Sequence, residues 1–230
     1  MTIMLFDSPQ PLTKSAIANA KLRGAYGALR YYSTRALLGN PRATIRSKDL
    51  THREALLGGP DWVWFTVWEV LAKAALKGAS QGDADGRAAV AQAKVVGQPT
   101  GTAIYFAIDF DPEPTSRPTC LDYAKGALTA AATAGYQGRV YAPGSILCEG
   151  IDKGILTGPQ WLTGGRGMSG YQEFIGRGLP YIEQMVGDPN RLDNGGAADD
   201  DRFHLANGVE SLAGLGGFKT SPDGRSLVVA

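Results

Sequence analysis

The sequence is poor in the residues that support metal and thiol chemistry. Its 230 residues include two cysteines, Cys120 and Cys148, and two histidines, His52 and His204. Two cysteines cannot form a disulfide framework, and a bridge between them cannot be inferred from sequence, so we expect two core thiols and leave the pairing open. Neither histidine stands in a spacing typical of zinc ligands. We therefore expect no metal site and no cofactor, with a cysteine nucleophile paired to a histidine as the alternative.

The sequence also lacks an excess of charge of either sign and any long apolar run. Twenty-three basic residues face 22 acidic ones, for a formal net charge of +1. This balance gives no overall field to hold a polyanion, so nucleic acid is not an expected partner. No apolar stretch reaches the length of a membrane span, and the N-terminus meets Asp7 without a preceding basic segment. We expect no membrane contact and no signal peptide, and a protein made in the cytoplasm.

Glycine is abundant instead, with 31 residues that punctuate short β-rich runs. Segments with helical spacing separate most of these runs, among them Asp85–Val96, a pattern typical of parallel strands joined by crossover helices. We expect an α/β fold, a (β/α)8 TIM-like barrel over residues 1–213 followed by a C-terminal tail over 214–230. Residues 163–168 are too few for a covering helix, so the last third of the barrel should be irregular. The eight candidate strands are Ile3–Phe6, Ala28–Tyr32, Trp62–Trp68, Ala103–Phe110, Arg139–Ala142, Gln160–Leu162, Ser169–Gln172 and Ala198–Arg202.

The fourth candidate strand ends in two carboxylates. Strand alternation puts Tyr105, Ala107, Asp109 and Asp111 on one face and apolar residues on the other. A barrel interior is packed, so inward carboxylates are expected at the C-terminal mouth, where barrel enzymes carry their active sites. Glycosidic cleavage needs such a pair, one to donate a proton and one to stabilise or attack the cationic centre. The alternative is that Asp111 starts an acidic loop and caps the next helix.

Other strand ends carry acids and aromatic residues as well. Asp7 follows the first candidate strand, Glu69 follows the third, and Asp199 to Asp201 close the last. Aromatic faces stack on the C–H faces of sugars while carboxylates and amides bind their hydroxyl groups, although core packing is the alternative for each tryptophan. Our candidate catalytic residues are Asp109, Asp111, Glu69 and Asp7, and our candidate substrate-binding residues are Tyr31, Tyr105, Trp68, Tyr141, Gln172, Asp199 and Asp201.

Two segments carry a resemblance to a known family. The run from Gly78 to Ala89 and the strand from Ile104 to Asp111 resemble the glycoside-hydrolase-like domain family formerly named domain of unknown function 1906. That family is common in actinobacteria and their phages. The resemblance implies a barrel related to the family 25 lysozymes, whose acidic residues match Asp7, Asp109 and Asp111 and, less closely, Asp199 or Asp201. Those lysozymes have Glu where this chain has Asp111. The resemblance therefore implies either that another carboxylate such as Glu69 is the proton donor or that activity on the muramidase substrate is reduced.

Two functions follow as hypotheses. The first is a lysin-like glycoside hydrolase that cleaves bacterial cell-wall polysaccharide by carboxylate acid/base catalysis, with Asp111 or Glu69 as proton donor and Asp109 as the charged partner. The second is a catalytically silent glycan-binding or structural virion protein on the same fold, because fold does not imply function. Both predict cell-wall glycan as a partner. The resemblance adds other virion proteins as possible partners and a virion-associated protein or one released at lysis.

Overall fold

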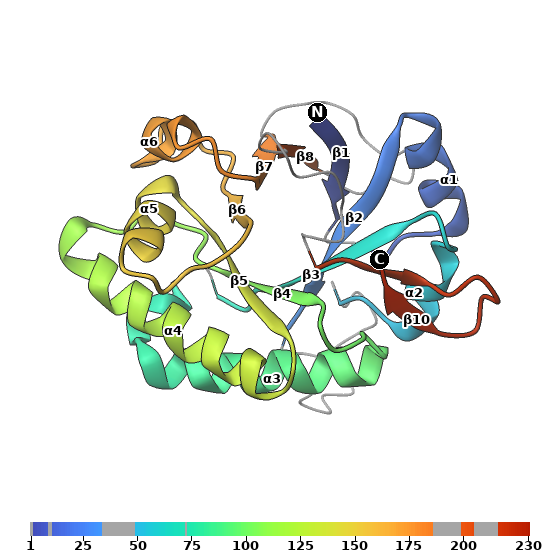
Figure 1. Cartoon of the computed structure of the whole chain (residues 1–230), viewed down its shortest axis with the longest axis horizontal. Helices are drawn as coiled ribbons and strands as arrows, with labels where there is room; N and C mark the ends of the chain where they lie inside the picture. Colours follow the sequence, from blue (N-terminus) through green and yellow to red (C-terminus); the bar gives the residue numbers. More distant parts are fainter. Residues whose placement is uncertain (1, 9–10, 34–48, 72, 186–198, 205–215) are drawn as a thin grey trace.

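Eight strands of the computed structural model pair into a closed ring (Figure 1). The structure describes residues 2–8, 11–33, 49–71, 73–185, 199–204 and 216–230, and for residues 2, 6 and 199–204 it describes the backbone alone. Strands β1 to β7 run parallel to their neighbours, and the pairing of β3 with β4 closes the ring. Strand β8 lies antiparallel between β7 and β1. The ring strands are β1 Thr2–Asp7, β2 Ala25–Tyr32, β3 Val63–Trp68, β4 Ala103–Ala107, β5 Gln137–Ala142, β6 Gln160–Leu162, β7 Tyr181–Met185 and β8 Asp199–His204.

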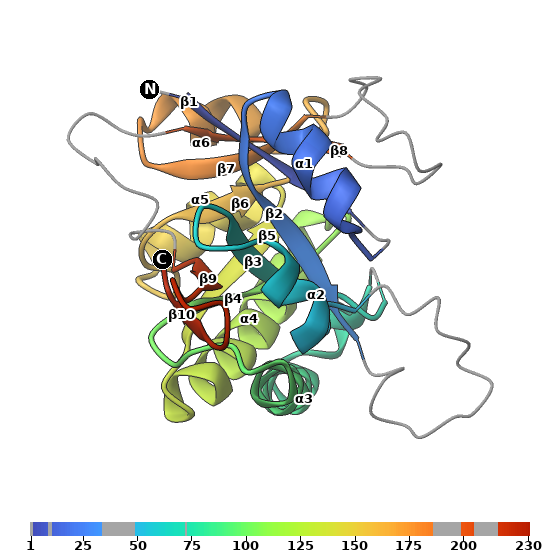
Figure 2. The same ribbon diagram turned by 90° about the vertical axis from the view of Figure 1, so that its right-hand side faces the viewer.

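Helices cover the outside of the ring. The two longest, α3 and α4, lie side by side across β3, β4 and β5 (Figures 1 and 2). Gly82 in α3 permits this close approach, because a Cβ atom there would overlap the carbonyl oxygen of Tyr123 in α4. Within the described residues, no helix is long and apolar enough to cross a membrane. The helices are α1 Lys14–Leu22, α2 His52–Leu57, α3 Ala79–Val96, α4 Arg117–Thr133, α5 Gly144–Asp152 and α6 Tyr171–Gly176, with 3-10 turns at η1 Ala74–Lys77 and η2 Pro114–Ser116.

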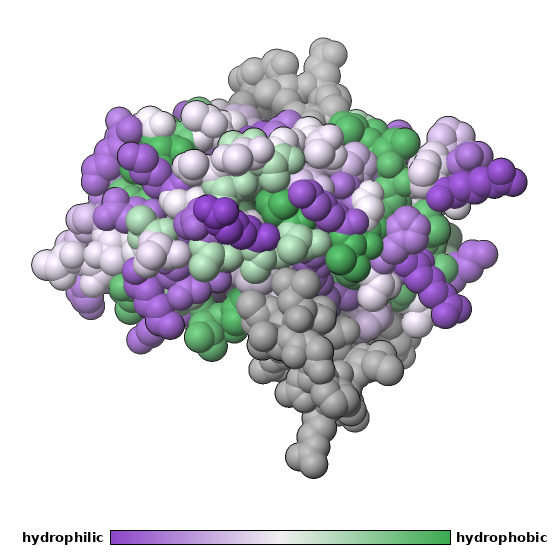
Figure 3. Space-filling model, turned by 90° about the horizontal axis from the view of Figure 1, so that it is seen from below, coloured by the Kyte–Doolittle hydropathy of each residue, from purple (hydrophilic) through white to green (hydrophobic). Residues whose placement is uncertain are grey.

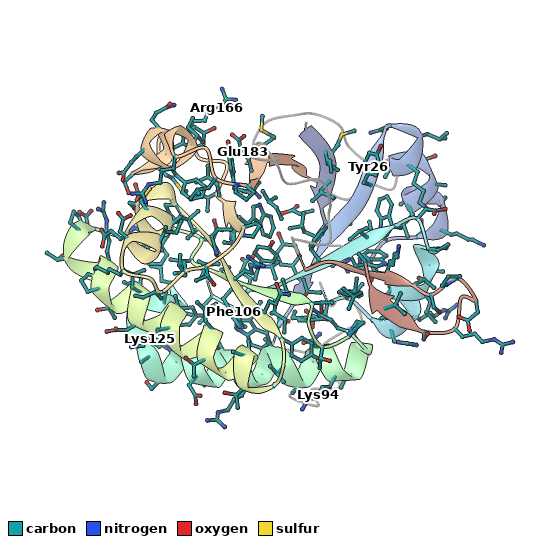
Figure 4. All side chains as sticks on the ribbon, in the orientation of Figure 1. Tyr26, Lys94, Phe106, Lys125, Arg166 and Glu183 are labelled. Carbon is teal, nitrogen blue, oxygen red and sulfur yellow. The ribbon has the colours of Figure 1, made fainter. Side chains whose placement is uncertain are left out.

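Two apolar layers follow from the alternation along each strand. Phe106 belongs to the outer layer, between β4 and the long helices, whereas Lys94 and Lys125 lie on the outer surface of those helices (Figure 4). Seen from below, this helical surface is largely hydrophilic with separate apolar groups (Figure 3). Tyr105 belongs to the inner layer, which fills the ring. The inner layer comprises Ile3, Leu5, Leu29, Val63, Phe65, Val67, Ala103, Tyr105, Ala107, Tyr141, Trp161 and Ile182.

The barrel prediction is confirmed, including its irregular last third, but one predicted strand is wrong. Ser169–Gln172 forms no strand, because Gly170 takes a left-handed conformation with φ of 73° and helix α6 begins at Tyr171. The seventh strand is Tyr181–Met185 instead. This strand has five residues, and Ile182 is its inner-layer residue, so its sequence shows too short an alternation to predict a strand.

The C-terminal tail, predicted over residues 214–230, contains a β-hairpin where it is described. Strands β9 Phe218–Thr220 and β10 Leu227–Val229 pair antiparallel, and Phe218 pairs with Trp64 of β3. Phe218 is fully buried and Gly216 accepts a hydrogen bond from the Ala103 amide at the start of β4. The hairpin therefore packs against the amino-terminal end of the barrel, opposite the mouth.

Candidate carboxylate site at the barrel mouth

Three predicted carboxylates stand where parallel strands end. Asp7 is the last residue of β1, Glu69 directly follows β3, and Asp109 stands two residues beyond β4. The carboxyl ends of parallel strands lie at the same end of the barrel. Asp7 is 2% exposed, whereas Glu69 and Asp109 are half-buried. Val67 and Ala107 belong to the inner layer, so alternation places Glu69 and Asp109 on the inward side of their strands.

A chain of hydrogen bonds joins two of these carboxylates across the mouth. Tyr31 of β2 donates its hydroxyl to Asp7 Oδ2 at 2.8 Å, and Gln184 Nε2 of β7 donates to the same oxygen at 3.4 Å. The Tyr141 hydroxyl of β5 lies 2.7 Å from Gln184 Oε1 and 3.2 Å from Asp109 Oδ1. The structure thus brings together the predicted residues Asp7, Asp109, Tyr31 and Tyr141. These four come from four different strands.

An aromatic floor lies beneath this chain. The rings of Tyr141 and Trp161 are 4.3 Å apart, and Tyr105 meets Trp161 edge to face at 6.2 Å. Tyr105 is fully buried, and burial raises its pKa to about 12 against the opposing charge of Arg139. A neutral phenol below the surface supports the site from underneath. The prediction that Tyr105 contacts substrate is therefore corrected to a packing role in the barrel interior.

Two further predicted substrate contacts lie elsewhere. Trp68 is 1% exposed and packs in the outer layer, because it alternates with Val67 and Glu69 and so points toward the helices. Its interpretation as a sugar-stacking side chain is wrong, and the core-packing alternative holds. Gln172 is exposed on helix α6 rather than on a strand. Its placement in the site rested on the wrong seventh strand.

Asp111 anchors a loop. Its Oδ2 accepts the backbone N–H of Ser169 at 2.9 Å, and its Oδ1 accepts a short hydrogen bond from the Ser169 hydroxyl. Ser169 is also in contact with Ser145 at 2.7 Å and with the Arg117 guanidinium at 3.3 Å. Asp111 is itself exposed. Both oxygens therefore serve to tie the loop before α6 to the loop after β4. The loop part of the alternative agrees with this position, whereas the helix caps that follow are Glu113 and Ser116 rather than Asp111.

The last strand contributes through its backbone. In β8, Asp199 pairs with Asp7, and Asp201 pairs with Leu5 of β1 and Gln184 of β7. The side chains of both residues lie outside the described part of the structure. Their predicted contact with substrate stays a prediction, made more specific by register positions beside the residues of the hydrogen-bond chain.

Sequence reasoning missed Gln184 and a buried ion pair. Arg30 is fully buried, and its Nε lies 2.7 Å from Oε1 of Glu54, which is 4% exposed. Arg30 also donates a short hydrogen bond to the carbonyl of Ser8, and Glu54 accepts the Leu12 amide at 2.8 Å. The pair therefore holds the backbone at Ser8, directly after Asp7, and at Leu12. An arginine inside a strand of apolar and aromatic residues was the available signal for it.

The cysteines and His52 have structural contacts away from the barrel mouth. Cys120 and Cys148 are free and buried, and burial raises the pKa of each thiol to about 11. Such thiols are poor nucleophiles at neutral pH because the thiolate is the reactive form. His52 Nδ1 lies 2.6 Å from the Val96 carbonyl oxygen. Among the described side chains, no three His, Cys, Asp or Glu residues gather as metal ligands would.

The chain matches a known protein family over most of its length. Residues 18–173, more than half of the sequence, match the model of the Rv2525c-like, glycoside hydrolase-like domain. The chain belongs to this family. The match includes β2 to β6 and most of the candidate site, with Asp7 and Gln184 outside its limits. No curated protein sequence matches the chain.

Solved structures share the fold at low sequence identity. The secreted protein Rv2525c of Mycobacterium tuberculosis, solved with L-tartrate, has a TM-score of 0.66 at 19% identity, over 89% of this chain and 95% of that one. An uncharacterized protein of B. stearothermophilus has a TM-score of 0.60 at 16% identity, over 86% and 94%. The modular autolysin LytC of Streptococcus pneumoniae, solved with a synthetic peptidoglycan ligand, has a TM-score of 0.54 at 10% identity. That similarity extends over 88% of this chain and 47% of LytC.

Proposed function

We propose that the chain binds bacterial cell-wall glycan at the barrel mouth and cleaves a glycosidic bond there. The observation that carries this proposal is the hydrogen-bonded group of Asp7, Tyr31, Asp109, Tyr141 and Gln184 at the ends of the strands. Carboxylate, hydroxyl and amide groups are the partners that sugar hydroxyls require, and two carboxyl groups are what glycosidic cleavage requires. The family assignment and the fold shared with the peptidoglycan-bound autolysin support the choice of glycan.

The roles of the carboxylates follow from their partners. Asp109 is the charged group that stabilises the cationic transition state, since it is half-buried and touches the Tyr141 hydroxyl at 3.2 Å. Asp7 orients the site because its Oδ2 accepts hydrogen bonds from both Tyr31 and Gln184. Glu69 is the proton donor, because it is half-buried at a strand end while Asp111 uses both oxygens to hold Ser169. Kinship with the family 25 lysozymes remains part of this proposal.

The test uses purified chain and actinobacterial cell-wall polymer. Release of reducing ends should fall by about 10²-fold or more in Asp109→Asn and Glu69→Gln, the range for loss of an acid/base or charge-stabilising group. Asp122→Asn, an exposed aspartate on α4, is the matched control and should retain full activity. Asp111→Asn should lower activity less than Glu69→Gln. Equal activity of Asp109→Asn and the control would contradict the proposal.

A silent glycan-binding protein is the second candidate. The observation that favours it is the use of Asp111, the position of the lysozyme glutamate in the resemblance, to anchor a loop. Pull-down of the polymer with its chain length unchanged would support binding alone, whereas shortened chains would support hydrolysis. In either case, the resemblance to actinobacterial and phage proteins supports a virion protein or a lysin as the setting.

A further inference from the structure

Gln184 lies near the end of β7 at the barrel mouth and forms hydrogen bonds in two directions. It lies on the inward side of β7, two residues beyond Ile182 of the inner layer. Its Nε2 donates to Asp7 Oδ2 at 3.4 Å, while its Oε1 lies 2.7 Å from the Tyr141 hydroxyl and 3.4 Å from the Gly164 amide nitrogen. One short polar side chain therefore contacts the ends of β1, β5 and β6.

The chemistry of these neighbours fixes the orientation of the amide. A reversed amide would point its oxygen at the Asp7 carboxyl group and its NH₂ at the Gly164 N–H. Both contacts would then join like groups, acceptor to acceptor and donor to donor. The oxygen of Gln184 must therefore face Tyr141, and the site requires a group that donates on one side and accepts on the other.

This orientation determines where the Tyr141 proton goes. A tyrosine hydroxyl has one proton, and among the described side chains two acceptor oxygens lie near it, Gln184 Oε1 at 2.7 Å and Asp109 Oδ1 at 3.2 Å. The shorter contact is at the usual O–H···O distance and holds the proton. Asp109 is left with the weaker contact, so its oxygen keeps capacity to accept a hydrogen bond from a ligand.

We propose that Gln184 is a positioning residue of the site, whose amide joins Asp7 to Asp109 through Tyr141 and draws the Tyr141 proton away from Asp109. The geometry requires a neutral amide at this position, because a carboxylate would face Asp7 and an apolar side chain would release the Tyr141 proton to Asp109. The effect on glycan rests on the function proposed above, whereas the hydrogen-bond chain itself does not.

Carboxyl groups of the hydrogen-bond chain lie close to Gln184 and would oppose another negative charge there. Asp7 contacts it directly and Asp109 lies one residue further along the chain of bonds. At the same end of the barrel Glu69 directly follows β3, and the backbone of Asp201 in β8 is the register partner of Gln184. The other titratable groups of the hydrogen-bond chain are the hydroxyls of Tyr31 and Tyr141. A carboxyl group introduced at position 184 should therefore favour its protonated form in the folded protein.

The decisive experiment compares the melting temperatures of Gln184→Glu and Gln172→Glu between pH 4 and pH 8. The second variant adds the same charge on the exposed face of α6 and serves as the matched control. The carboxyl introduced at position 184 is expected to have a raised pKa in the folded state. Its stability contribution is therefore complete below about pH 4.3, the unfolded value, and is lost as the pH rises. For every unit by which the pKa of this carboxyl group rises on folding, the melting temperature at pH 8 should fall by about 3–5 °C.

Two further arms keep the test decisive. In an Asp7→Asn background, the pH-dependent loss of Gln184→Glu should become smaller. Should Gln184→Glu not fold at any pH, the cycle of Gln184→Met and Tyr141→Phe replaces it, and the two effects on melting temperature should not add. Identical melting profiles for Gln184→Glu and Gln172→Glu, or additive effects in the cycle, would overturn the positioning role.

The glycan arm separates this inference from the proposed function. At pH 7, Gln184→Met should bind less cell-wall polymer in the pull-down, or cleave less of it, than wild type. Gln184→Glu should regain polymer binding or cleavage as the pH is lowered toward 4. If the melting profiles are as expected but wild type neither binds nor cleaves polymer, the positioning role stands and the proposed function fails. If wild type acts on polymer and Gln184→Met acts equally well, the positioning role fails and the proposed function stands.

Discussion

The buried pair of Arg30 and Glu54 allows the sharpest stability prediction. The Arg30 side chain is fully buried and that of Glu54 is 5% exposed, so neither charge reaches water. Glu54→Leu removes the acceptor for Arg30 Nε at 2.7 Å, for Arg30 Nη2 at 3.2 Å and for the Leu12 amide at 2.8 Å. It leaves a buried guanidinium without its carboxylate partner, while the bond to the Ser8 carbonyl is retained.

The expected cost of Glu54→Leu is about 3–5 kcal/mol, the range for removing one partner of a buried ion pair. For a chain of this size, that corresponds to a fall in melting temperature of about 6–20 °C. The double variant Arg30→Met with Glu54→Leu removes both charges and should lose much less than the sum of the single variants. Denaturant unfolding monitored by circular dichroism measures all three variants.

Two results would show that Arg30 and Glu54 do not form a dry, coupled ion pair. One is a loss below about 1 kcal/mol for Glu54→Leu, which would mean that Arg30 finds water or another partner and is not held in a dry site. The other is a double variant that loses the full sum of the single losses, which would mean that the two side chains act independently. Arg87→Met serves as the control because its ion pair with Asp83 is exposed and should contribute about 0–1 kcal/mol.

Two further predictions concern packing and pH. Gly82→Ala should destabilise the protein by about 1–3 kcal/mol in denaturant unfolding, because the new methyl group would overlap the Tyr123 carbonyl oxygen; Gly176→Ala, with open space around it, should be neutral or stabilising. Tyr105→Phe should reduce the loss of stability in alkaline melts. Burial raises the pKa of Tyr105 from 10.0 to about 12, so its contribution is complete below pH 10 and is lost as the pH rises toward 12. An unchanged alkaline profile for Tyr105→Phe would contradict its buried placement.

The barrel could be predicted because its strands carry strong local patterns. Alternation from Ala103 to Asp111 correctly separated Phe106 in the outer layer from Tyr105 in the inner one, and it placed Asp109 at the mouth. The seventh strand was missed because Tyr181–Met185 is short and partly polar. Gln184 was missed with it, since a glutamine becomes part of a site only through the partners that tertiary structure supplies.

The roles of individual side chains were harder to predict than their positions. Trp68 and Tyr31 both stand near the ends of strands, yet Trp68 packs under the helices and Tyr31 donates to Asp7. Asp111 was correctly placed near the mouth, but its partner Ser169 lies 58 residues further along the chain. Sequence spacing holds no information on such a contact, so the sequence could place Asp111 at the start of a loop but could not predict that it holds Ser169.

Cleavage of cell-wall polymer by Asp109 variants tests whether this carboxylate serves glycan chemistry at the barrel mouth. Wild type, Asp109→Asn and Asp122→Asn are incubated with actinobacterial cell-wall polymer, and released reducing ends and polymer length are measured together. We predict shortened polymer with wild type and with Asp122→Asn, and a loss of about 10²-fold or more with Asp109→Asn. Intact polymer with folded wild type, or equal cleavage by all three proteins, would contradict the account.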